Sequence, residues 1–395
     1  MRFQPIVCRS ATRPTERLTA RLIWFGRATA LAFFPAIVTG FFAIQACGVE
    51  SSYSESRTSD SDAGFEALAW SEGDTTPANF KVAFLGDQGD GRAARAVLRL
   101  VHDEGAAMVL HQGDFDYDHD PEKWDATITS VLGADFPYFA SVGNHDEDDF
   151  YGSGGYQEKL QQRLDRVAGA KCTGDLGVKS ACRYQGLYFV LSGAGTMGRG
   201  HEDYIRKALA ADSSTWRICS WHKNQTALQL GEKDNDVGWG PYEACREAGA
   251  FVVSGHEHTY SRTKTLVDTR RQKVDPDWAD PANLRVAPGA TFVVVAGLGG
   301  HSIRNQDRCR PTAYPYGCNG EWAMIYTSDQ GAQFGAMFID FNVDGDPNKA
   351  RGYFKNIDGE VVDRFTITSQ NRDQRQQATS QAPARLEPSA VTGGD

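Results

Sequence analysis

The stretch that decides the fold is His111-Gln112-Gly113-Asp114-Phe115-Asp116-Tyr117, which directly follows the apolar segment Ala107–Leu110. A short apolar segment followed by glycine and polar residues is typical of a buried strand that ends in a loop. Asp114 and Tyr117 lie three residues apart on that loop, so a carboxylate and a phenol are close enough to bind one cation. The stretch therefore predicts a strand end that carries part of a metal site.

Short apolar segments alternate with amphipathic segments along most of the chain, which predicts buried strands alternating with helices. The predicted strands are Phe80–Leu85, Ala107–Leu110, Tyr138–Val142, Leu187–Leu191, Arg217–Trp221, Phe251–Ser254 and Thr291–Ala296, and the predicted helices are Gly91–Glu104, Gly155–Ala168, Glu202–Ala211 and Pro241–Ala248. This alternation favours an α/β sandwich with polar residues at the carboxyl ends of its strands. Turn sequences at Asp344-Gly345 and Asp358-Gly359 predict hairpins of antiparallel strands near the end of the chain.

Five of the predicted strands end in a polar cluster. The clusters are Gly86-Asp87-Gln88-Gly89, Gly113-Asp114-Phe115-Asp116-Tyr117, Gly143-Asn144-His145-Asp146, Trp221-His222-Lys223-Asn224 and Gly255-His256-Glu257-His258. A single Gly-Asp or Asn-His pair is more often a turn than a metal site. Five clusters, each at a strand end, are hard to explain as turns and predict one shared site.

The chemistry of these donors divides them into two groups. The first group is Asp87, Asp114, Tyr117 and His258, and the second is Asn144, His222, His256 and the same Asp114. A cation bound by the first group would have three anionic ligands if the phenol ionises, whereas a cation bound by the second group would have one anionic ligand. A phenol with a pKa of about 10 loses its proton readily to a strong Lewis acid such as Fe(III). The donor sets therefore favour a trivalent ion beside a divalent one.

The order of the clusters resembles that of the purple acid phosphatases, within the calcineurin-like metallophosphoesterase superfamily, from about Phe80 to Thr368. The shared pattern is Asp, then Gly-Asp-x-x-Tyr, Gly-Asn-His, a single His, and Gly-His-x-His. Most of the superfamily has a ligand His where this chain has Gly89, and Tyr117 is the residue typical of purple acid phosphatases. The resemblance implies a four-layer αββα sandwich of two mixed sheets flanked by helices.

The resemblance also implies roles for single residues. Fe(III) would be bound by Asp87, Tyr117 and His258, a divalent ion (Fe, Zn or Mn) would be bound by Asn144, His222 and His256, and Asp114 would bridge the two. The substrate-binding residues would be Asn144, His145 and His222, with His145 as the proton donor to the leaving oxygen. The expected activity is that of an acid phosphatase, in which an activated water attacks the phosphorus of a small phosphate monoester in line.

Two other functions stay open at this stage. The same scaffold also suits a phosphodiesterase, and a surface lipoprotein that binds a partner without catalysis is the alternative from a different class. Plant relatives have further histidines near the fourth cluster, where this chain has Lys223-Asn224-Gln225, so the leaving-group side of the site is not predicted. Gly193–Gly198 matches the glycine spacing of a dinucleotide-binding loop, but Ser220 and Trp221 stand where that motif needs an acidic residue. We expect instead a loop near the metal site.

The N-terminal region predicts export. Residues 1–46 contain six arginines and one glutamate. All seven precede the uncharged segment Ala28–Ala46, which ends this region. Ile44-Gln45-Ala46-Cys47 resembles a bacterial lipobox, which predicts a lipid on Cys47 and a membrane-anchored lipoprotein at the periplasmic or outer surface. An ordinary cleaved signal and an uncleaved span are the alternatives. Residues 47–78 and 369–395 are expected to be a disordered tether and tail, leaving 79–368 as the catalytic domain.

Charge and cysteine usage agree with an exported enzyme. The formal net charge is -10, and because residues 1–46 carry +5, the remainder carries -15. Such an acidic body disfavours nucleic acid as a partner, since phosphates are bound mainly by Lys and Arg. Two cysteine pairs close short loops and predict disulfides, namely Cys172 with Cys182 and Cys309 with Cys318. Cys219 and Cys245 are either a third pair or two buried thiols.

Overall fold

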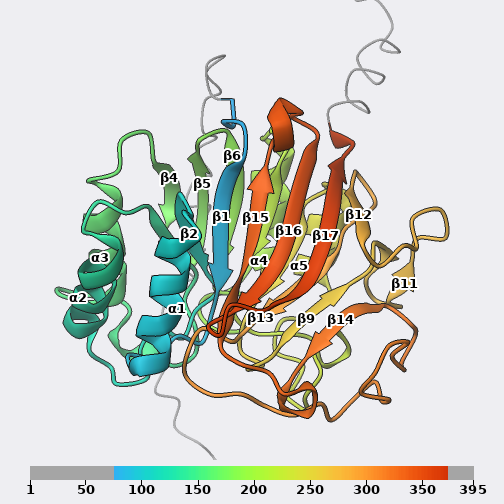
Figure 1. The fold of residues 1–395 in the computed structure, drawn as a ribbon. Coiled ribbons are helices and arrows are strands. Elements are labelled where there is room, and N and C mark those ends of the chain that lie inside the picture. The colour runs from blue at the N-terminus through green and yellow to red at the C-terminus, as the bar shows by residue number, and fades with distance from the viewer. Residues whose placement is uncertain (1–74, 372–395) are drawn as a thin grey trace, which may run out of the picture. The chain divides into compact units, whose positions relative to one another are not determined.

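Two mixed β-sheets face each other in residues 75–371, the part of the chain described by a computed structural model (Figure 1). The first sheet has the order β12 (Asn283–Val286), β17 (Val361–Ser369), β16 (Lys349–Asn356), β15 (Gly335–Phe341), β1 (Phe80–Leu85), β2 (Met108–His111) and β3 (Tyr138–Ala140). The second has the order β14 (Trp322–Tyr326), β9 (Tyr260–Thr263), β13 (Val293–Ala296), β8 (Phe251–Ser254), β7 (Arg217–Ser220), β6 (Leu187–Ser192), β5 (Lys179–Tyr184) and β4 (Lys171–Asp175). A two-stranded sheet is formed by β10 (Leu266–Asp268) and β11 (Lys273–Val274).

Helices cover the outer face of each sheet. The first sheet is flanked by α1 (Arg92–Asp103), α2 (Pro121–Leu132) and α3 (Tyr156–Leu164), and the second by α4 (His201–Ala210) and α5 (Gly240–Glu247) (Figure 1). The inner faces share one apolar core, in which Phe84 of β1 meets Phe251 of β8 edge to face with ring centroids 6.1 Å apart. The predicted αββα order of layers is confirmed.

The predicted strands and helices are all present, with ends that differ by a few residues. The helix α2 was not predicted, because its buried side chains Trp124, Thr127 and Ile128 form too narrow an apolar stripe to be noticed. Its start did carry a signal. Asp120 caps the helix by accepting a 3.0 Å hydrogen bond from the Lys123 backbone, and a proline follows it in the first turn.

The strand directions explain why the polar clusters meet. β1, β2 and β3 are parallel to one another, and so are β6, β7 and β8, so each set has its carboxyl ends at one edge of its sheet. The two edges are joined where the Gly86 N–H donates to the Ala296 carbonyl at 2.8 Å. The loops after β2 and β3 also touch, since a Cβ on Gly113 would lie 2.7 Å from the Gly143 Cα. Loops from both sheets therefore build one site.

The described residues contain three disulfides: Cys172–Cys182, Cys219–Cys245 and Cys309–Cys318. The first and third were predicted. The second joins β7 to α5, which decides between the two alternatives left open for those cysteines. The expected signal, Cys47 and nearly all of the tether and tail lie outside residues 75–371. Within those residues, no helix is long and apolar enough to cross a membrane.

Candidate metal centre

Two groups of potential ligands lie side by side at the joined edges of the sheets. Asp87, Asp114 and His258 form one group, and Asp114, His222 and His256 form the other, with the donor atoms of each group within 4.8 Å of one another. Asp114 belongs to both groups, as the sequence predicted for a bridging carboxylate. Asp87, Asp114 and His222 are at most 1% exposed. Buried carboxylates this close together need a positive charge between them.

Tyr117 completes the first group. Its hydroxyl oxygen lies 3.1 Å from Asp87 Oδ1 and 3.2 Å from His258 Nε2. Burial and the carboxylates of Asp87 and Asp114 raise the pKa of this phenol well above its usual value. The phenol therefore keeps its proton unless a cation bound beside it displaces that proton.

Asn144 supplies the clearest sign that the second group fits a cation. Its side-chain oxygen is buried and has no hydrogen-bond partner among the described residues. Buried acceptors are nearly always paired, so an unpaired one needs an explanation such as an ion. Asn144 follows β3, next to the loop that carries Asp114. A divalent cation in this group would satisfy the orphaned oxygen.

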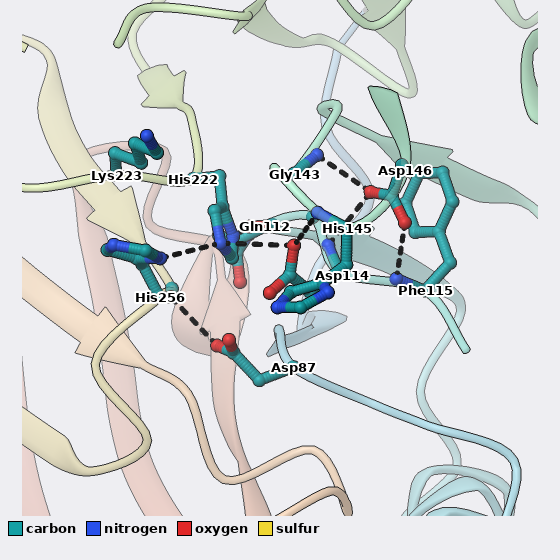
Figure 2. A network of polar contacts seen from close by, with 12 residues as sticks. Asp87, Gln112, Asp114, Phe115, Gly143, His145, Asp146, His222, Lys223 and His256 are labelled. Atoms are coloured by element: carbon teal, nitrogen blue, oxygen red, sulfur yellow. Dashed lines mark hydrogen bonds and ion pairs between the residues drawn. The ribbon is translucent and has the colours of Figure 1, made fainter. Parts of the chain in front are cut away.

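The orientation of His222 suits a metal ligand. Its Nδ1 lies 2.7 Å from the Gln112 carbonyl and donates to it, so Nε2 is left to face Asp114 Oδ1 at 3.2 Å and His256 Nδ1 at 3.1 Å (Figure 2). A carbonyl that fixes one ring nitrogen is the usual outer support of a metal-binding histidine. Burial alone would lower the pKa of His222, but the carboxylates of Asp114 and Asp87 raise it to about 9.

Backbone strain accompanies the ligands. Asp87, Asp114, Tyr117 and His256 all have left-handed φ values, at 58°, 59°, 64° and 68°. Each such residue costs on the order of 1 kcal/mol or more, and strained residues of this kind cluster at functional sites. These left-handed residues follow β1, β2 and β8, whose ends meet at the site, so the strain accompanies the convergence of their side chains.

The glycines in the clusters leave room for the carboxylates. A Cβ on Gly143 would lie 2.2 Å from Asp114 Oδ1, and one on Gly255 or Gly297 would lie 2.8 Å from Asp87 Oδ2. No larger residue fits these places without moving a carboxylate. Gly143 and Gly255, which precede Asn144 and His256, therefore need to be glycine because a carboxylate of another cluster lies against each of them.

Asp146, the last residue of the third cluster, lies at the centre of these loops, although the sequence predicted no role for it. Its fully buried carboxylate accepts three backbone hydrogen bonds, from Asp114 at 2.9 Å, Phe115 at 2.8 Å and Gly143 at 2.7 Å (Figure 2). Burial raises the pKa of Asp146 well above its usual value. The side chain ties the loop that carries Asp114 to the loop that carries Asn144 and His145.

His145 lies on the open side of the centre. Its backbone N–H donates to Asp114 Oδ1 at 3.0 Å, while its imidazole is exposed beside the Tyr117 ring, with centroids 4.6 Å apart. On that ring lies a second imidazole, His301, nearly parallel at 10° and 3.5 Å. The His301 backbone N–H also donates to the Asp87 carbonyl at 3.0 Å. The sequence did carry a signal for His301, because Gly297-Leu298-Gly299-Gly300-His301 follows a strand and resembles a loop near the metals of the purple acid phosphatases.

Comparisons with known proteins agree with this arrangement. Residues 80–260 match the model of the calcineurin-like phosphoesterase family. A nucleotide pyrophosphatase/phosphodiesterase of Hordeum vulgare is 25% identical over 308 residues, which cover 70% of this chain and 76% of that protein. A purple acid phosphatase from seeds of yellow lupin (Lupinus luteus) has the same fold with a TM-score of 0.53 at 19% identity.

The match to the lupin structure covers 76% of this chain and 55% of that one, so this chain spans about half the length of the lupin protein. This likeness shows that the two mixed sheets of this chain have the fold of the lupin protein. The matched segment contains all five clusters in full. Residues 80–260 of this chain are therefore similar to the calcineurin-like phosphoesterase family.

Proposed function

We propose that this protein hydrolyses phosphate monoesters at a two-metal centre of the purple acid phosphatase type. The observation that carries the proposal is the position of Asp114, whose carboxylate belongs to both donor groups. Fe(III) would be held by Asp87, Asp114, Tyr117 and His258, and a divalent ion (Fe, Zn or Mn) by Asp114, Asn144, His222 and His256. Bound there, such ions supply Lewis acidity toward phosphate oxygens and activate water.

The side chains around the ions have separate tasks in this proposal. His145 is exposed beside Tyr117 and would bind a phosphate oxygen and donate a proton to the leaving oxygen. Asn144 and His222 would also face the phosphate from the divalent side. Asp146 holds the loops of Asp114 and His145 together, so the donor and the bridging carboxylate keep their spacing.

A phosphodiesterase is the second candidate, because the barley relative is named a nucleotide pyrophosphatase/phosphodiesterase. Hydrolysis of p-nitrophenyl phosphate and of bis(p-nitrophenyl) phosphate by the purified protein separates the two. We expect the higher kcat/KM for the monoester, together with two metal ions per chain by elemental analysis. If the bis-ester is the better substrate, the protein is a phosphodiesterase and the monoesterase proposal is wrong. If metal-loaded protein hydrolyses neither ester, the non-catalytic alternative is supported.

Export and lipid anchoring belong to the proposal as well. They are supported by the N-terminal sequence and by three disulfides, which persist mainly in oxidising compartments. Labelling with a fatty acid in a bacterial host tests the anchor: Cys47→Ser should abolish the label. Equal labelling of both proteins would exclude Cys47 as the lipid site.

A further inference from the structure

Lys233 reaches the metal centre from the loop between β7 and α5, outside the five clusters. Its ammonium donates a hydrogen bond to the His256 carbonyl. Burial lowers the pKa of this ammonium, whereas the carboxylates of Asp87 and Asp114 raise it, so both carboxylates are close enough to act on its charge. A cation that the sequence did not predict therefore lies beside the donor group of His256.

The backbone around Lys233 is held in place by several hydrogen bonds. The Lys233 carbonyl accepts from Thr226 Oγ1 and from Gln229 Nε2, both at 2.8 Å. The Leu230 carbonyl accepts from two backbone N–H groups of the segment between β13 and β14, at 3.0 Å each. A side chain on a fixed backbone loses less freedom when it binds a ligand, so this arrangement suits a binding residue.

Gly231 brings the same loop against the fifth cluster. A Cβ on Gly231 would lie 2.4 Å from Glu257 Oε2, so a larger residue would push the loop away from the segment that carries His256 and His258. Glu257 itself is buried. The loop is thus packed directly on the segment that supplies two proposed ligands.

Lys233 differs from Lys223, another lysine close to His256. Figure 2 shows Lys223 beside His256, and the Lys223 ammonium forms a 3.2 Å ion pair with Asp236. Within residues 75–371, Lys233 forms no ion pair with a carboxylate, and the His256 carbonyl accepts one of its three N–H donors. The charge of Lys233 is therefore available to a ligand.

The charges of the proposed centre favour an anion at this place. A ferric and a divalent ion bring five positive charges, against three on the anionic ligands Asp87, Asp114 and Tyr117. The centre would keep two positive charges, and Lys233 adds a third at close range. Like charges repel strongly where little water screens them, so an anion beside Lys233 stabilises the group. A phosphate monoester supplies two negative charges above its second pKa of about 6.

We propose that Lys233 binds a non-bridging oxygen of the phosphoryl group and thereby makes the centre select phosphate monoesters over diesters. The inference rests on the proposed function and names a residue that decides its substrate class. A monoester offers three non-bridging oxygens that share two charges, whereas a diester offers two that share one. His145 lies beside Tyr117 and Lys233 beside His256, so one side chain near each donor group would hold the phosphoryl group.

Binding of inorganic phosphate to metal-loaded protein, measured by calorimetry, tests this role without catalysis. Lys233→Gln keeps a donor for the His256 carbonyl but removes the charge, so metal content should stay at the wild-type level. We expect the Kd for phosphate to rise about 10-fold to 100-fold, as for the loss of one charge-assisted hydrogen bond. Lys264→Gln is the matched control, because Lys264 also donates to a backbone carbonyl, that of Gly320 at 2.8 Å, and belongs to neither donor group.

Hydrolysis measures the selectivity. In Lys233→Gln, kcat/KM should fall about tenfold more for p-nitrophenyl phosphate than for its bis-ester, and Lys233→Arg should recover part of this loss because it keeps the charge. Normal phosphate affinity in Lys233→Gln with both metals bound, or an equal loss for the two esters, overturns the inference. Phosphate binding that depends on Lys233 in a protein that hydrolyses neither ester overturns the proposed catalysis and supports Lys233 as a phosphate ligand.

Discussion

Asp146 Oδ2 accepts a 2.9 Å hydrogen bond from the Asp114 backbone N–H, across 32 positions of sequence. The same carboxylate accepts from Phe115 and Gly143, so a residue that need not touch metal or substrate sets the place of the bridging ligand. Three N–H donors on one buried carboxylate leave no other group able to replace it without an unpaired donor.

Asp146→Asn should therefore weaken metal binding. An amide has the same shape, but its NH2 group faces N–H donors, so at least one buried hydrogen bond is lost at a cost of about 1–3 kcal/mol in stability. We expect metal affinity to fall about 10-fold to 100-fold, as for other supports of metal ligands. Metal titration and thermal unfolding measure both effects. Asp148→Asn, an exposed neighbour, should change neither, and normal metal affinity in Asp146→Asn would contradict this role.

Tyr117→Phe tests the ferric part of the proposed centre. Wild-type protein with bound iron should absorb visible light, because a tyrosinate transfers charge to Fe(III), and the phenylalanine variant should be colourless. Tyr151→Phe is the control, since its hydroxyl donates to Asp175 on the surface. A colourless wild-type protein that is fully active with manganese or zinc alone would remove iron from the proposal.

His145→Ala should lower kcat for ester hydrolysis by about 10²-fold to 10⁴-fold, the usual range for loss of a general acid. Metal content should stay at the wild-type level, because the His145 imidazole belongs to neither donor group. His119→Ala serves as the control, since His119 pairs with Asp149 in an exposed loop. Undiminished activity in His145→Ala would show that another group donates the proton.

His301→Ala should loosen Tyr117. The two rings stack 3.5 Å apart, and the Tyr117 hydroxyl must point at Asp87 and His258 to serve as a ligand. We expect a shift of the visible absorption band and weaker iron binding, with His301→Phe restoring both because it keeps a flat ring on Tyr117. An unchanged spectrum in His301→Ala would mean that the stack does not orient the phenol.

Acid stability should depend on Glu104, far from the metal centre. Its carboxylate accepts from Tyr353 at 2.6 Å and from Lys355 at 2.5 Å. Burial opposes ionisation of Glu104, but these donors outweigh it and hold its pKa below 4.5. A carboxyl group with a lowered folded-state pKa stabilises the protein above its unfolded pKa, and that contribution is lost as pH falls through the folded value.

Glu104→Gln should consequently reduce the free energy of unfolding by about 1 kcal/mol at neutral pH. The difference from wild type should shrink as pH falls below the ordinary pKa of a glutamate, and it should vanish below the lowered folded-state pKa, where the wild-type carboxyl group is protonated too. Denaturant unfolding at several pH values measures it. Asp103→Asn, at an exposed position beside Glu104, should show no such pH-dependent difference, and a constant difference for Glu104→Gln would contradict the linkage.

The amino-acid sequence by itself determined the alternation of strands and helices and the ligand candidates, whereas the order of the layers was implied by the resemblance to a known family. Strand ends are local features, so the apolar segments before Asp87, Asp114 and His256 mark these residues as loop residues at strand ends. The parallel order of the strands then brings such loops to one edge. The chemical types of the donors suggested two unlike cations before any distance was known. The local sequence was sufficient to predict these ligands because each cluster includes the turn that follows its strand.

Only the tertiary structure decided how the clusters support one another. Three contacts join residues that are distant in the chain: Asp146 with Asp114, His301 with Tyr117, and Cys219 with Cys245. No periodicity in the sequence predicts these contacts. Such contacts depend on packing two sheets at one edge, and their geometry follows from the whole core and from no single segment.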